Sequence, residues 1–229
     1  MLGFYDYTVV LTYMSAISAG LGILVTLLGE GHPYKGMFFL LFCGLCDAFD
    51  GKVARTKKNR TEAERQFGIQ IDSLSDLIAF GVLPACIGEA MIRVCPTIEE
   101  TVRGASNRIE WLAITAIWVV ILLYILAALI RLAYFNVMEE IRQKEEGGVR
   151  KYYEGLPVTS ASLIFPTVLL LQYVTIRDIT PLYIIAMFFT GIAFVSKIRI
   201  PKPDTKGILI MIAFGLAEFI ILGLLWMLG

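Results

Sequence analysis

The sequence predicts an all-α integral membrane protein built as a polytopic bundle of helices. Of its 229 residues, 57% are hydrophobic and 17% are charged, whereas soluble domains are about 45–50% apolar and about 25% charged. Apolar runs close to the ~20 residues that cross a hydrocarbon core recur along the chain. Strand-like alternation is missing, and lipid admits only helices or closed barrels. Together these observations favour membrane helices over strands.

About seven apolar segments are predicted to cross the membrane. In chain order they cover roughly residues 8–28, 34–53, 69–93, 109–136, 157–175, 180–196 and 207–228. The fifth and sixth are short, and the residues between them predict a tight hairpin. Neither an internal repeat nor a separate soluble domain is evident, so residues 1–229 are expected to form a single transmembrane domain.

The distribution of charge predicts the orientation in the membrane. Fourteen Lys and Arg residues lie in the loops that follow the second, fourth and sixth segments, and five lie in the opposite loops. Cytosolic loops carry the excess of positive charge, so the N-terminus is expected inside and the C-terminus outside. The stretch from Lys197 to Lys206 is interpreted either as a stiff loop near anionic headgroups or as a topology determinant alone. A net charge of zero gives no reason to expect nucleic-acid binding.

Cysteine and histidine usage excludes several kinds of site. Cys43 and Cys46 form a C-x-x-C pattern, but they lie inside a predicted span, so we interpret them as small packing residues. Cys86 and Cys95 suggest no disulfide framework. The one histidine, His32, argues against His-based triads and His-rich metal sites. We expect no cleavable signal peptide, because no basic stretch precedes the first apolar run.

Four aspartates at the cytosolic ends of the second and third segments define the candidate site. Asp47 and Asp50 are spaced i, i+3, and Asp72 and Asp76 are spaced i, i+4, so each pair shares one helical face. Ionisable groups at membrane depth are costly and need a partner or a task. If the two helices pack antiparallel, the four carboxylates converge.

Converging carboxylates favour a divalent metal. Like charges oppose one another's ionisation in a low dielectric, and a divalent cation removes that conflict. Oxygen ligands suit Mg²⁺ or Mn²⁺, with Ca²⁺ as a further possible ion. Such sites commonly act on phosphate groups. The alternative, in which these carboxylates pair with nearby Lys and Arg, explains one aspartate more readily than the whole spaced set.

Small residues accompany the aspartates. Gly51 and Ala54 in the second segment, and Gly68 before the third, would let a ligand approach the helix backbone closely. Arg55 follows at once and could balance phosphate charge. The pattern therefore predicts a bound molecule that carries phosphate.

These residues together carry a family resemblance. The pattern is Asp47-x-x-Asp50-Gly51-x-x-Ala54-Arg55, a linker, and then Gly68-x-x-x-Asp72-x-x-x-Asp76. It resembles the signature of the CDP-alcohol phosphotransferase family. The linker Thr56 to Phe67 is longer than in the family's usual pattern and mostly polar, which indicates a longer cytosolic loop.

Further stretches are similar to the membrane-type (class II) phosphatidylserine synthases of that family. They are Ile71 to Asp76, Phe80 to Ala85, Arg131 to Val137, and Tyr153 to Pro157. The resemblance implies a bundle with a six-helix core, usually a homodimer, in which an alcohol displaces CMP from a CDP-linked donor. It implies CDP-diacylglycerol and L-serine as substrates, and an enzyme in a prokaryotic cell membrane with its active site facing the cytosol.

The same resemblance implies roles for individual residues. Asp47, Asp50 and Asp72 would ligate metal, and Asp76 would ligate metal or act as the general base on the acceptor hydroxyl. The residues implied in nucleotide binding are Gly51, Ala54, Arg55, Gly68, Thr12 and Ser15. Candidates for lipid phosphate or the serine carboxylate are Arg131, Asn136 and Lys151, for which interfacial snorkelling is an equally good interpretation.

Other functions remain open from the sequence. A sister enzyme could use glycerol 3-phosphate or inositol phosphate as acceptor, or could transfer from CDP-choline or CDP-ethanolamine to diacylglycerol. A transporter would bind coupling ions through intramembrane carboxylates. That reading requires charges near the bilayer midplane, whereas here they gather at one membrane face.

Overall fold

The computed structural model describes residues 3–28, 33–94, 107–145, 152–175, 178–202 and 204–228. It confirms the predicted all-α class. The helices are α1 (Val10–Leu27), α2 (Pro33–Ala54), α3 (Glu62–Asp76), α4 (Leu83–Val94), α6 (Asn107–Glu145), α7 (Ala161–Leu170), α8 (Thr180–Val195) and α9 (Thr205–Leu228). Short helical turns are η1 (Tyr7–Val9), η2 (Leu77–Val82), η3 (Val158–Ser160) and η4 (Leu171–Tyr173).

Membrane-spanning helices account for most of the described chain. Four are long and apolar enough to cross a membrane, namely Tyr7–Leu27, Glu62–Val94, Trp111–Arg142 and Lys206–Leu225. Two shorter apolar helices, Val158–Tyr173 and Thr180–Val195, lie beside them. Helix α2 has the length of a span but also carries Asp47 and Asp50. Each predicted segment therefore contains a helix, and the protein is an integral membrane protein.

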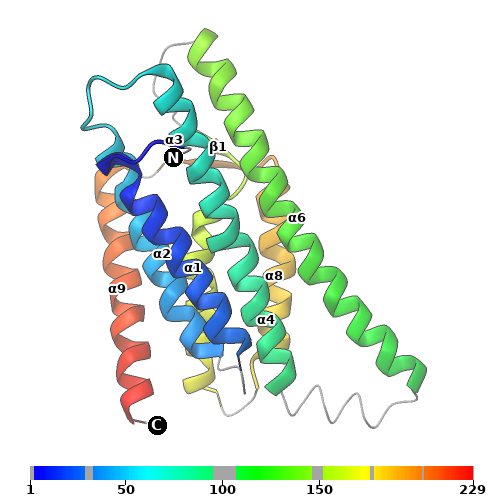
Figure 1. Ribbon diagram of the computed structural model, residues 1–229. Coiled ribbons are helices and arrows are strands. Elements are labelled where there is room, and N and C mark those ends of the chain that lie inside the picture. The colour runs from blue at the N-terminus through cyan, green and yellow to red at the C-terminus, as the bar shows by residue number, and fades with distance from the viewer. Residues whose placement is uncertain are drawn as a thin grey trace.

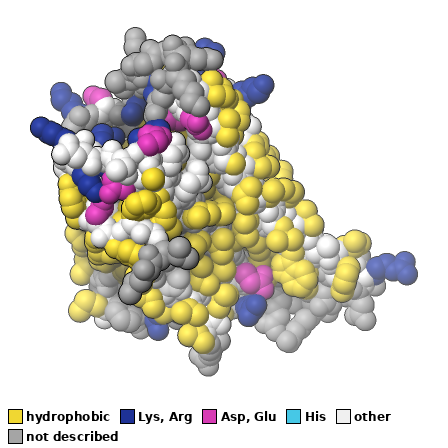
Figure 2. All heavy atoms as spheres, turned by 45° about the horizontal axis from the view of Figure 1, so that its top comes forward, with side chains coloured by type: hydrophobic (Ala, Val, Ile, Leu, Met, Phe, Trp, Pro, Cys, Tyr) yellow, Lys and Arg dark blue, Asp and Glu magenta, His cyan; other side chains and the backbone are white. Residues whose placement is uncertain are grey.

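The helices lie roughly side by side, with α6 leaning away from the bundle at one end (Figure 1). The N-terminus lies near the end that carries the α2–α3 loop, and the C-terminus lies at the other. Viewed toward that first end, most of the charged side chains in sight gather there, and hydrophobic side chains cover much of the flanks (Figure 2). This distribution fits a bundle with one charged face at a membrane surface.

Two helix boundaries differ from the prediction. Helix α3 begins at Glu62, seven residues before the apolar run, because Thr61 and Glu64 form a capping box. The Thr61 hydroxyl accepts from the Glu64 amide at 3.2 Å, and the Glu64 carboxylate accepts from the Thr61 amide at 2.8 Å. Helix α6 continues to Glu145 rather than 136. Hydropathy finds the lipid-crossing part of a helix and misses its polar extension into water.

The turn η2 is a stretch of π-helix between α3 and α4. The Tyr124 hydroxyl of α6 donates to the Phe80 carbonyl at 2.5 Å inside the core, which satisfies a backbone group in the irregular turn. A Cβ on Gly81 would lie 3.3 Å from the Ala128 side chain, so η2 and α6 pack closely. Irregular helix is tolerated at membrane depth where neighbouring helices bury it. The π-turn follows directly after Asp76 and so helps to set where α3 ends.

A two-stranded ribbon joins distant parts of the chain. Strand β1 (Tyr152–Glu154) pairs antiparallel with β2 (Arg199–Pro201). The expectation of no strands is wrong here, because backbone outside the hydrocarbon can pair without closing a barrel. Gly155 follows β1 at φ +76°, and a Cβ there would lie 2.7 Å from the Phe194 carbonyl oxygen. Only glycine takes that backbone conformation readily.

Candidate metal and substrate site

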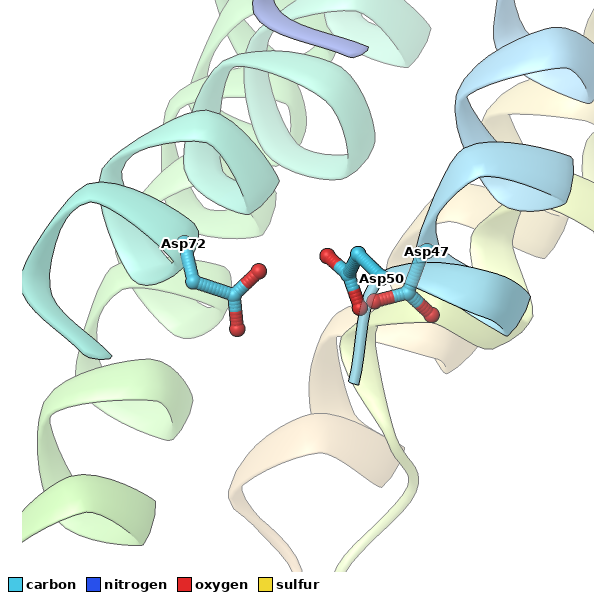
Figure 3. A group of neighbouring side chains, drawn as sticks. All are labelled: Asp47, Asp50 and Asp72. Carbon is cyan, nitrogen blue, oxygen red and sulfur yellow. The ribbon is translucent and has the colours of Figure 1, made fainter. Parts of the chain in front are cut away.

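Three carboxylates meet between α2 and α3. One oxygen from each of Asp47, Asp50 and Asp72 lies within 4.8 Å of the others. Asp47 and Asp50 come from α2 and Asp72 comes from α3, and Figure 3 shows all three side chains directed into the gap between the two helices. The antiparallel packing predicted from their spacing brings them together. The three are half-buried, so water reaches them only in part.

This carboxylate cluster has the donor set of a hard cation. Magnesium, manganese and calcium take oxygen ligands, and three carboxylates in one partly buried place repel one another unless a cation lies between them. No Lys or Arg forms an ion pair with these aspartates in the part of the chain that the structure describes. Neutralisation by neighbouring basic side chains, the alternative raised by the sequence, is therefore not what the structure has.

Asp76 lies one turn beyond Asp72 on α3 and is only 8% exposed. It is not one of the three residues whose oxygens meet within 4.8 Å. Its neighbour Ser75 donates a hydrogen bond to the Thr12 carbonyl of α1 at 3.1 Å. Asp76 therefore stands deeper in the bundle than the carboxylate cluster, on the face that the spacing predicted.

The small residues leave room beside the cluster. A Cβ on Gly51 would meet only the tip of the Arg55 guanidinium, at 3.9 Å. A Cβ on Gly68 would lie 2.8 Å from Nη2 of Arg60, so the space over Gly68 is filled by that arginine. Ala54, at the end of α2, is half-buried, and Arg55 is exposed just after it.

Two residues of α1 predicted to bind nucleotide are buried in the core. Thr12 is 5% exposed and Ser15 is 3% exposed. The Ser15 carbonyl accepts from the Cys43 thiol at 3.3 Å, and the Ser15 hydroxyl has no hydrogen-bond partner among the described residues. Cys43 and Cys46 are both buried thiols without a disulfide, as expected of packing residues.

The acceptor candidates fall in different places. Asn136 of α6 donates from Nδ2 to the Ser73 hydroxyl at 2.7 Å, which ties α6 to the residue after Asp72. Arg131 is 5% exposed, and its Nε donates to the Leu156 carbonyl at 3.2 Å, so it supports the chain after β1. Lys151 lies outside the described residues, as do His32 and Cys95.

Sequence reasoning missed two polar side chains. Arg60, in the α2–α3 loop, rests over Gly68, and nothing in the loop's composition sets it apart from its charged neighbours. Glu218, in the middle of α9, is 2% exposed and accepts a hydrogen bond from the Thr167 hydroxyl of α7 at 2.5 Å. A single acid within an apolar run is a signal that could have been used.

Comparison with known proteins places this site in a wider context. The family model for CDP-alcohol phosphatidyltransferase matches residues 8–199, which include the whole site and leave α9 outside. No solved structure matches the chain.

Several curated relatives are similar over most of the chain. The CDP-diacylglycerol–serine O-phosphatidyltransferase of Saccharomyces cerevisiae is 30% identical over 195 residues, which are 78% of this chain and 62% of the relative. The archaetidylserine synthase of Methanothermobacter thermautotrophicus is 27% identical over 197 residues, 86% of this chain and 70% of the relative. A Mycobacterium bovis serine O-phosphatidyltransferase is matched over 39% of its length. The chain thus spans less than two thirds of the yeast and mycobacterial relatives.

Proposed function

This chain belongs to the CDP-alcohol phosphatidyltransferase family, and from that premise we propose that it transfers the phosphatidyl group of CDP-diacylglycerol to L-serine. The observation that carries the proposal is the carboxylate cluster of Asp47, Asp50 and Asp72 within the matched region. Relatives named for transfer to serine cover most of the chain, and they support serine as the acceptor.

The reaction makes one phosphorus–oxygen bond and breaks another. The serine hydroxyl oxygen attacks the phosphorus that carries the diacylglycerol, and the bond from that phosphorus to the oxygen shared with CMP breaks. The leaving CMP takes the bonding electron pair, and the hydroxyl proton passes to a base on the protein. The products are phosphatidylserine and CMP. Positioning and stabilisation of charge supply most of the acceleration in phosphoryl transfer.

The carboxylate cluster suits a divalent metal in this reaction. Asp47, Asp50 and Asp72 would hold the ion, which we propose to be Mg²⁺ or Mn²⁺. A bound divalent ion supplies Lewis-acid stabilisation of charge on phosphate oxygens. The protein's own part is to hold the three carboxylates from two helices at the spacing of their approach.

Asp76 is the proposed general base. It is nearly buried one turn beyond Asp72, away from the three oxygens that meet. A carboxylate outside the ligand set has an oxygen available for a proton. General-base catalysis by a positioned side chain contributes about 10²–10⁴-fold. The deeper position of Asp76 favours this role over a fourth ligand.

The remaining residues are proposed to bind the substrates. Gly51 and Ala54 would admit the nucleotide along α2, with Arg55 near its phosphates. Asn136, bonded to Ser73 beside Asp72, is the best placed of the acceptor candidates. From the charge pattern we place this end of the bundle in the cytosol, and from the family resemblance we propose a homodimer in a prokaryotic cell membrane.

A second donor is favoured by one specific observation. The archaetidylserine synthase aligns with 86% of this chain, so a donor with ether-linked chains is the principal alternative to CDP-diacylglycerol. The chemistry at phosphorus is the same for both lipids. Only the groove for the tails would differ.

The test is release of CMP by the purified protein in detergent. It uses CDP-diacylglycerol or its ether analogue with Mg²⁺ or Mn²⁺, and L-serine, glycerol 3-phosphate, inositol phosphate or no acceptor. Release that requires both serine and metal is expected. Release with another acceptor would keep the mechanism and change the substrate, and absence of release under every condition would contradict the proposal.

A further inference from the structure

The loop between α2 and α3 brings Arg60 onto the candidate site. Its Nη2 lies 2.8 Å from where a Cβ on Gly68 would be, so the guanidinium rests against the bare backbone of α3. Gly68 precedes Asp72 by four residues and shares its helical face. Arg60 therefore lies about one helical turn, roughly 6 Å along α3, from the residue that reaches the carboxylate cluster.

Contacts with the N-terminal segment hold this loop in place. Lys57 forms ion pairs with Asp6 at 2.6 Å and with Glu64 at 2.8 Å, which links the segment before α1 to the first turn of α3. The Lys57 ammonium is the main cause that lowers the pKa of Asp6 to about 2. The rings of Phe4 and Phe67 pack edge to face, with centroids 5.4 Å apart. The arginine is thus presented by a loop fixed at both sides.

The charge of Arg60 lacks a counter-ion. Its Nη2 donates to the neutral Thr8 hydroxyl at 3.2 Å, and its buried Nε has no hydrogen-bond partner. Across the described ranges no carboxylate lies within ion-pair distance of it. Arginine is charged at every physiological pH, and a partly buried charge without a partner is costly.

Helix stability does not explain the position either. Arg60 directly precedes Thr61, the N-cap of α3. The helix macrodipole makes this end partly positive, so a cation here is slightly destabilising and an anion is favoured. An arginine that is unpaired, half-buried and next to a helix N-terminus is one that an anionic ligand would complete.

We propose that Arg60 binds a phosphate of the nucleotide donor, over the face of α3 that Gly68 leaves bare. The planar guanidinium presents several N–H groups that match phosphate oxygens. This inference rests on the proposed function, because it takes the bound anion to be the diphosphate of a CDP-linked donor. Arg60 comes from the longer α2–α3 linker, so this contact is a property of that loop.

Two rival explanations make different predictions. Arg60 could instead balance the charge of the carboxylate cluster from a distance, and its removal would then tighten metal binding. It could also stack on the cytosine ring, and removal would then weaken binding of the nucleoside as much as that of the nucleotide. A staple to the N-terminal segment would depend on the Thr8 hydrogen bond rather than on charge.

The experiment measures binding to the full-length protein in detergent with Mg²⁺ by calorimetry. The probes are CDP and cytidine, and Mg²⁺ is titrated separately. The variants are Arg60→Gln and Arg60→Lys. Two controls are matched to them: Arg65→Gln removes an arginine that pairs with Glu62 at 2.7 Å, and Thr8→Val removes the hydroxyl that Arg60 contacts while keeping its charge. Melting temperatures confirm that each variant is folded.

Arg60→Gln is expected to weaken CDP binding about 10-fold or more, the loss typical of a hydrogen bond to a charged group. Cytidine affinity should change less than about 2-fold, Arg60→Lys should recover part of the loss, and both controls should resemble the parent protein. Unchanged CDP affinity in Arg60→Gln, an equal loss for cytidine, an equal loss in Thr8→Val, or a change in Mg²⁺ affinity alone would each overturn the assignment. Failure of the parent protein to bind CDP with Mg²⁺ would overturn the proposed function itself.

Discussion

Carboxylates are buried in two regions of this membrane protein, and they are accommodated in different ways. Between α2 and α3, Asp47, Asp50 and Asp72 bring oxygens within 4.8 Å of one another. In the middle of α9, Glu218 stands alone, 2% exposed, with a hydrogen bond from Thr167 at 2.5 Å. Its other oxygen has no partner in the described part of the structure.

The difference shows how to separate a binding site from a packing feature. A lone carboxyl in an apolar bundle costs least as the neutral acid, and one hydroxyl partner then satisfies much of its polarity. Three adjacent carboxylates would each have to be neutral, or else share a cation. The cluster therefore requires something that the protein alone does not supply, whereas Glu218 does not. The family model, which ends at 199, includes the first region and excludes the second.

Removal of divalent metal should produce the largest effect and affect only the first region. We expect stripping with EDTA to reduce serine-dependent CMP release to background, because the proposed reaction needs the ion at the cluster. Addition of Mg²⁺ or Mn²⁺ should restore it. Full turnover in metal-free buffer would remove the proposed distinction between the two regions.

Asp76→Asn should reduce turnover about 10²–10⁴-fold, because the variant loses the proposed general base. Asparagine keeps nearly the same shape and cannot take the hydroxyl proton. Donor binding, measured with CDP and Mg²⁺, should remain close to that of the parent protein. Near-normal turnover would show that Asp76 is not the base, and loss of CDP binding would assign it to the metal instead.

Asp50→Ala should reduce turnover about 10²–10³-fold, the range for loss of one group that stabilises charge in the reaction. In contrast to Asp76→Asn, the variant should also bind donor more weakly across a metal titration, because one of three ligands is missing. CDP affinity that is unchanged at every Mg²⁺ concentration would contradict the assignment of Asp50 as a ligand.

Substitutions at Glu218 should affect stability and leave the chemistry alone. Glu218→Gln keeps an oxygen that can accept from Thr167, so we expect turnover within about 2-fold of the parent protein. Glu218→Ala leaves a gap and removes that bond, which should destabilise the fold by about 1–3 kcal/mol. Thermal unfolding in detergent measures the second effect. A large loss of turnover in Glu218→Gln at unchanged melting temperature would give α9 a role in the reaction.

The sequence by itself determined the class of the protein, most of its spans and the residues of its candidate site. Lipid leaves few options for a polar backbone, so long apolar runs can be assigned to helices without further information. The spacing of Asp47 and Asp50, and of Asp72 and Asp76, placed each pair on one face because helical geometry is local. These properties depend on neighbours along the chain.

Only the tertiary structure decided how those faces meet. The packing of α2 against α3 selects Asp47, Asp50 and Asp72 as the oxygens that come together and leaves Asp76 deeper. Likewise, the N-terminal segment fixes the loop that sets Arg60 over Gly68. Such contacts join residues far apart in the chain, and no local pattern encodes them, because their free energy arises from the packing of whole helices.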